Sequence, residues 1–102
     1  MRTQDQIIDA IVKVLSQERQ VTKVFFFTHP VPNSSQNKIS LIIYEDCDPD
    51  YIISQFKYET LLKNIGNDVI LNILPVNCMD AQKSLDKRLE DYLCIYNKKV
   101  ND

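Results

Sequence analysis

The residues with the clearest capacity for acid–base or metal chemistry lie between positions 29 and 50. His29 is the only histidine, and its side chain suits a general acid or base, but no partner lies near it in sequence. The pair Ser34-Ser35 offers a nucleophile without a nucleophile-elbow motif, and it fits a turn better. Asp46, Asp48 and Asp50 have an Asp-x-Asp-x-Asp spacing but lack the glycine and glutamate of a calcium loop. They are weak metal candidates, because helix capping explains the same pattern.

These residues surround a loop that joins two apolar runs. The runs are Val24–His29 and Ile39–Ile43, and the loop is Pro30–Asn37. The loop is too short for a crossover helix, which predicts antiparallel strands. Neither run contains a carboxylate. The sequence therefore predicts the architecture of an active site without its acidic groups.

Composition indicates a small globular protein. With 102 residues, of which 44% are hydrophobic, we expect a single domain over 1–102. The net charge of −2 argues against nucleic acid as a partner, and no apolar run approaches the roughly 20 residues that span a membrane. The polar start Met1–Gln6 does not resemble a signal peptide, so the expected location is cytoplasmic. The three cysteines are widely spaced, which predicts free, partly buried thiols rather than a zinc cluster or a disulfide framework: Cys47, Cys78 and Cys94.

The apolar pattern predicts an α+β fold in the order α-β-β-α-β-α, with helices packed on a three-stranded mixed sheet. Thr3 and Gln6 match a capping box at the first helix. Phe25, Phe26 and Phe27 alternate across the sheet, so a partly covered face would be a place for a partner or second subunit. The expected elements are helices over 3–19, 48–65 and 80–98 and strands over 21–28, 38–45 and 68–74.

The middle helix has predicted ends as well as a predicted buried side. Asp48 suits the N-cap and Pro49 the first helical position, and Gly66 suits the C-cap. The strand–helix–strand order predicts a parallel neighbour, with Pro75 ending the last strand. The expected buried stripe of this helix is Ile52, Phe56, Leu61, Leu62 and Ile65.

Four segments carry a family resemblance over nearly the whole chain: Phe26-Phe27-Thr28-His29, Asn37–Ile43, Asp68–Asn72 and Leu93–Asn97. Their layout resembles the minimal nucleotidyltransferase domains of prokaryotes. In that family the first strand ends in hydrophobic-Phe-Gly-Ser, the second reads Ser-Asp-hydrophobic-Asp-Leu, and the third reads roughly Val-Asp-Leu-Val. The closing helix of the family ends in an apolar-Tyr signature.

The departures from the family pattern fall on its functional positions. The resemblance places Thr28-His29 at the phosphate-binding Gly-Ser pair, where a Thr28 side chain would crowd the triphosphate. It places Lys38 and Ser40 at the aspartates that hold Mg²⁺, and Ile70 at the third carboxylate, with Asn72 the nearest polar residue. Two-metal phosphoryl transfer needs such oxygen ligands. The resemblance therefore implies a degenerate member with no catalytic residue, cofactor or metal.

Three hypotheses follow. The first is a nucleotidyltransferase-like pseudoenzyme that binds a small protein partner or itself, because the resemblance implies antitoxin-like or accessory roles. The second is a nucleotide-binding or nucleotidyl-transferring enzyme with rearranged ligands, using Asp46, Asp48 or His29. The third is an unrelated small α+β domain.

Overall fold

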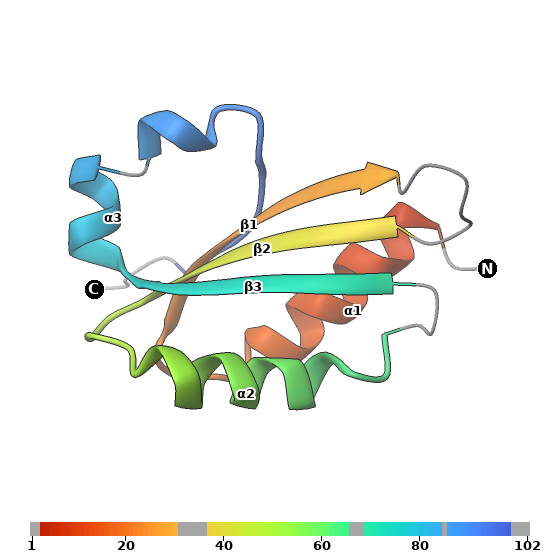
Figure 1. The fold of residues 1–102 in the computed structure, drawn as a ribbon, viewed down its shortest axis with the longest axis horizontal. Helices are drawn as coiled ribbons and strands as arrows, with labels where there is room; N and C mark the ends of the chain where they lie inside the picture. Colours follow the sequence, from red (N-terminus) through yellow and green to blue (C-terminus); the bar gives the residue numbers. More distant parts are fainter. Residues whose placement is uncertain (1–2, 31–36, 66–68, 85, 99–102) are drawn as a thin grey trace.

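A computed structural model describes residues 3–30, 37–65, 69–84 and 86–98 (Figure 1). One mixed sheet carries helices on both faces. The elements, in chain order, are α1 (Gln4–Leu15), β1 (Val21–Pro30), β2 (Asn37–Glu45), α2 (Tyr51–Leu62), β3 (Val69–Asn77), α3 (Cys78–Ser84), the 3₁₀ helix η1 (Asp86–Leu89) and β4 (Leu93–Asn97).

The sheet has the strand order β3-β2-β1-β4. Strand β1 pairs with β2 in antiparallel fashion and β2 pairs with β3 in parallel, so both predicted pairings are confirmed. Strand β1 runs through Pro30, which pairs with Asn37 at the end of the ladder, two residues beyond the predicted end. The loop residues Pro32, Ser34 and Ser35 lie outside the described residues.

Helix α1 starts as the sequence predicts and ends earlier. The Thr3 hydroxyl accepts from the Gln6 backbone N–H, and the Thr3 N–H donates to Gln6 Oε1 at 3.0 Å, which completes the capping box. Its buried side is Ile7, Ile11 and Leu15. These three residues repeat every four positions, which is the spacing that turns one side of a helix toward a sheet.

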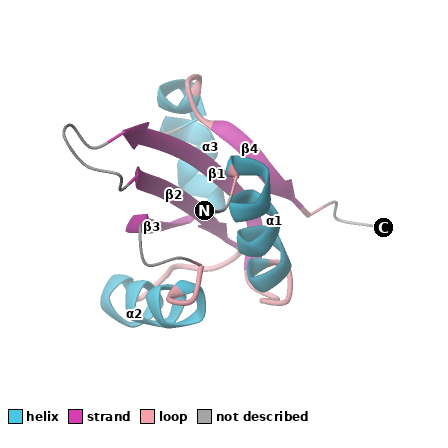
Figure 2. Ribbon diagram, turned by 90° about the vertical axis from the view of Figure 1, so that its right-hand side faces the viewer, coloured by secondary structure: helices cyan, strands magenta, loops and turns pink. Residues whose placement is uncertain are grey.

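The two faces of the sheet carry separate cores. On the α1/α2 face, Leu41 and Ile43 of β2 pack with α1 and α2, and on the α3 face, Ile42 and Tyr44 pack with Ala81 and Leu89. Successive residues of a strand point to opposite faces, so both faces of β2 are covered. In Figure 2, α1 lies beside β1 and β4 and α2 beside β3, whereas α3 lies behind the strands.

The prediction of a three-stranded sheet and of one helix over 80–98 is wrong. That segment forms α3, η1 and then β4, which pairs antiparallel with β1 over Lys23–Phe26. Leu89, Tyr92 and Tyr96 have helical spacing, but Ile95 and Tyr96 also have high β-propensity. The free edge of β1 decides between the two structures, because β4 satisfies its backbone groups.

Strand β3 extends past its predicted end at Leu74 and includes Pro75. Gln55 Nε2 donates to the Ile73 carbonyl at 2.9 Å, so the backbone groups of Ile73 point to the open edge of the sheet. Backbone groups two residues apart on a strand point to the same side, so those of Pro75 also point to the open edge. The N–H that proline lacks would therefore not have paired with β2, and the strand tolerates a proline at this position.

Helix α2 departs most from its prediction. Its N-cap is Asp50, whose Oδ1 accepts from the Ile53 N–H at 3.2 Å, rather than Asp48. The helix ends at Leu62 instead of Ile65, and the predicted C-cap, Gly66, lies outside the described residues. Leu62 and Ile65 are buried as expected, but three members of the predicted stripe are exposed: Ile52, Phe56 and Leu61.

Candidate functional site

The positions that the family resemblance singles out lie in adjacent rows of the sheet. His29 pairs with Lys38, and Lys38 pairs with Ile70. In the next row, Ser40 lies between Phe27 and Asn72. The strand alternation turns all of these side chains to the α3 face. The structure therefore gathers these positions without any carboxylate among them.

Thr28 belongs to the opposite face. It follows Phe27 and precedes His29 along β1, so its side chain points away from theirs. The side chains of Thr28 and His29, which the resemblance places at the phosphate-binding pair, thus point to opposite faces of the sheet and do not form one binding site.

His29 packs against an aromatic neighbour. Its ring lies edge-on to Phe27, with ring centroids 4.3 Å apart, and Phe27 also contacts Tyr92 at 5.1 Å. Edge-to-face packing of this kind stabilises a half-buried strand surface. This ring contact of His29 therefore points to packing rather than to acid–base work.

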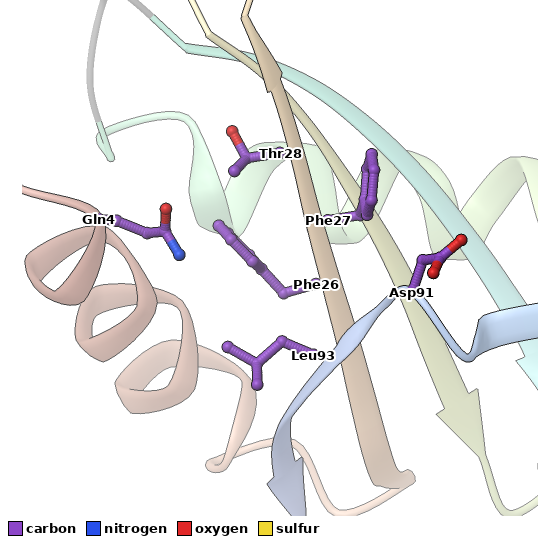
Figure 3. A pocket seen from close by; sticks show the side chains of 6 residues that line it. All are labelled: Gln4, Phe26, Phe27, Thr28, Asp91 and Leu93. Atoms are coloured by element: carbon purple, nitrogen blue, oxygen red, sulfur yellow. The ribbon is translucent and has the colours of Figure 1, made fainter.

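A small hollow opens beside β1 where β4 begins. It measures about 200 Å³ and is lined by Gln4, Phe26, Phe27, Thr28, Asp91 and Leu93. Figure 3 shows Gln4, Phe26, Thr28 and Leu93 on one side of β1, with Phe27 and Asp91 on the other. Asp91 repels phosphate, and pockets for drug-sized ligands are usually about 300 Å³ or more. The hollow does not suit a nucleotide triphosphate.

The acidic segment before α2 has structural partners. Asp48 Oδ1 accepts from Asn77 Nδ2 at 2.8 Å, and Asp50 caps α2. The Asp46 backbone N–H donates to the Gln20 carbonyl at 2.9 Å. Within the described ranges, no three His, Cys, Asp or Glu side chains are grouped to hold a metal ion. Asp50 is therefore the aspartate that caps α2, whereas Asp48 holds the side chain of Asn77.

The cysteines are free thiols, but only Cys78 is partly buried, and Cys47 and Cys94 are exposed. Desolvation and the neighbouring charges of Asp46 and Glu45 raise the pKa of Cys47. A raised pKa lowers the thiolate fraction on which nucleophilicity depends. Cys47 is therefore a poor nucleophile.

A buried series of hydrogen bonds that the sequence did not reveal connects the turn before β1 with β2 and α2. Gln20 Nε2 donates to the Tyr58 hydroxyl at 3.2 Å, and that hydroxyl donates to Glu45 Oε1 at 3.0 Å. Tyr58 is fully buried, and Glu45 is 3% exposed with no hydrogen-bond partner for Oε2 among the described residues. Burial raises the pKa of Glu45, while the Tyr58 and Ser54 hydroxyls act against it. Burial likewise raises the pKa of Tyr58.

Helix α2 turns its most apolar side to the solvent. Ile52 is 80% exposed, Phe56 71% and Ile53 66%, and Tyr51 at the start of the helix is exposed as well. We call Ile52, Ile53 and Phe56 the α2 surface. Exposed large apolar residues that gather on one element are unusual and mark interaction sites.

Long-range hydrogen bonds fix this orientation of α2. Tyr58 reaches Glu45 and Gln55 reaches the backbone of β3 from the sheet side of the helix. Phe56 lies two positions from Tyr58, which is about 200° around the helix, so it faces away from the sheet. A rotation that buried Phe56 would break both bonds. The sequence does carry a signal for this orientation. Apolar residues lie on both sides of α2, and Gln55 and Tyr58 are the polar residues that can bond to the sheet.

No helix within the described ranges is both long and apolar enough to cross a bilayer.

Comparisons of this chain with models of protein families, with curated proteins and with solved structures gave no match.

Proposed function

We propose that this chain is a non-catalytic, nucleotidyltransferase-like module with a regulatory or accessory role, and that it acts by binding a protein, either a small partner or a second copy of itself. The observation that carries the proposal is the α2 surface. Each such side chain contributes roughly 1.5–3 kcal/mol when a partner buries it fully. Three of them on adjacent turns supply the apolar centre that stable interfaces have.

The positions that the resemblance assigns to phosphate and Mg²⁺ support the non-catalytic part of the proposal. Lys38, Ser40 and Ile70 lie side by side without a carboxylate. Magnesium takes oxygen ligands, and a lysine at this place repels the ion. Antitoxin-like and accessory roles come from the resemblance and belong to the proposal.

Nucleotide binding is tested by thermal unfolding with ATP and MgCl₂. We expect no magnesium-dependent rise in Tm, because a ligand raises Tm only when it binds the native state. A clear rise that requires Mg²⁺ would contradict the non-catalytic assignment.

Protein binding is tested at the α2 surface itself. A photo-crosslinking amino acid at Phe56 in the source cells should trap a protein, which mass spectrometry identifies. The purified partner should then bind the wild-type chain and bind the Phe56→Asp variant at least about tenfold more weakly.

Met79→Asp is the matched control, because Met79 is also exposed, at 66%, but lies on α3. We expect it to leave binding unchanged. If Phe56→Asp and Met79→Asp bind the partner equally well, α2 is not the binding surface.

A further inference from the structure

We infer that the partner of the α2 surface is a second copy of this chain, bound through antiparallel packing of the two α2 helices. This inference rests on the proposed function, since it names the protein that the surface binds.

The charges along α2 are complementary to those of the same helix reversed. Three exposed carboxylates precede the helix, at Asp46, Asp48 and Asp50. Its second half carries Lys57, and its C-cap is Lys63, against the single acid Glu59. In an antiparallel pair, the acidic start of each helix meets the basic end of the other. The two helix dipoles are also opposed, which is the favourable arrangement.

Apolar residues and charges share one side of α2. Ile52, Phe56 and Lys63 follow one another at spacings of four and seven, which keeps them on one stripe of a helix. Lys57 Nζ lies 2.6 Å from Glu18 Oε1 in the same chain. Lys63, which is exposed at the end of the stripe, is therefore the cation that we assign to the contact.

A twofold axis near Phe56 accounts for both the apolar contact and the pairing of opposite charges. It stacks Phe56 on the partner's Phe56, brings Ile52 over the partner's Thr60, and places Lys63 opposite the partner's Asp48–Asp50. Contacts of this kind are isologous: each pair occurs twice, and the assembly closes as a dimer. A parallel pair would instead place the three aspartates against each other.

The size of α2 predicts a weak dimer. Its 12 residues span about 18 Å, so one side of it covers less than the ~800 Å² per partner of a standard interface. We therefore expect monomer and dimer to exchange, with a concentration-dependent mass.

Sedimentation equilibrium of the purified full chain tests the inference, from about 10 μM to about 1 mM, the range that suits weak interfaces. The wild-type chain should approach the dimer mass. Phe56→Asp should raise the dissociation constant at least about tenfold, and Met79→Asp should leave it unchanged. A wild-type chain that stays monomeric throughout overturns the inference.

Charge reversal tests the antiparallel arrangement. Lys63→Glu should weaken the dimer several-fold, because it places two acidic groups together twice. Asp48→Lys combined with Lys63→Glu should restore it, since the same pairs re-form with opposite signs. If the double variant associates more weakly than Lys63→Glu alone, the antiparallel contact is wrong. Both positions are exposed, and circular dichroism checks that the variants fold.

The failure of this inference differs from that of the proposed function. A monomeric purified chain whose position 56 crosslinks to a different polypeptide overturns the homodimer and keeps the protein-binding function. A chain that neither dimerises nor crosslinks at position 56 overturns both.

Discussion

Glu45 shows how one buried side chain links the stability of the protein to pH. Its Oε1 accepts from the Tyr58 hydroxyl, and burial raises its pKa above the ordinary value of 4.5. The native state therefore holds this proton more tightly than the unfolded chain does. By linkage, the contribution of Glu45 to stability is fully present below pH 4.5 and is lost as pH rises through the native pKa.

The Glu45→Gln variant should remove this pH dependence, because its amide is neutral and its Oε1 still accepts from Tyr58. We expect the free energy of unfolding of the variant, relative to wild type, to rise as pH increases above 4.5. Urea denaturation at several pH values measures the difference.

Glu90→Gln is the control, because it removes a carboxyl from an exposed position that has no part in the raised pKa of Glu45. It should leave unchanged the pH dependence of the free energy of unfolding that Glu45 causes. A difference between Glu45→Gln and wild type that does not change with pH would contradict the raised pKa.

Among the elements, α2 has two apolar sides with different functions. Leu62 is buried at 1% exposure and packs in the core on the α1/α2 face, whereas Ile52 is 80% exposed. Leu62→Ala should destabilise the fold by about 2–5 kcal/mol, and Ile52→Ala should change stability by less than about 0.5 kcal/mol.

Urea denaturation at dilute protein, where association does not contribute, measures both values. Equal destabilisation by the two variants would mean that Ile52 is buried and that the orientation of α2 differs.

The same helix shows where prediction from sequence succeeds and where it stops. Helix α1 and the β1–β2 hairpin are predictable, because Thr3, Gln6 and the aromatic run Phe25–Phe27 act locally. The orientation of α2 is not, since Phe56 and Leu62 are equally apolar. The bonds from Gln55 and Tyr58 to distant strands decide which of them is buried.

Strand β4 and the candidate site likewise show that local signals can be predicted from the sequence and contacts between distant residues cannot. Leu93–Asn97 satisfies a helical as well as a strand pattern, and its pairing with β1, far away in sequence, selects the strand. The adjacency of His29 and Lys38 follows from the predicted antiparallel pairing. The α2 surface is missed, because exposure depends on the tertiary packing.

At the scale of the whole molecule, the two faces of the sheet differ in how firmly they are covered. The α1/α2 face has the larger core, and the α3 face is covered by a short helix and η1 at the end where β3 finishes (Figure 1). Segments with few buried contacts open at lower free energy than the main core.

Hydrogen exchange should therefore detect opening of α3 before global unfolding. Leu89→Ala removes a side chain of the smaller core, which is 5% exposed, and should speed exchange in α3 while leaving α1 protected.

Ile11→Ala, in the larger core, should lower protection in α1 and α3 alike. Native-state exchange followed by NMR distinguishes the two patterns. Equal loss of protection in α1 for both variants would show that the sheet and its two layers unfold together.

Pro75 and Gln55 also have a consequence for behaviour at high concentration. Proline presents no N–H at the outer edge of β3, and the Gln55 side chain already occupies the Ile73 carbonyl. That edge is a poor template for an incoming strand, and such blocked edges protect proteins from fibril growth. A protein with this much apolar β-structure thus has, at β3, an edge that disfavours the strand-by-strand addition through which fibrils grow.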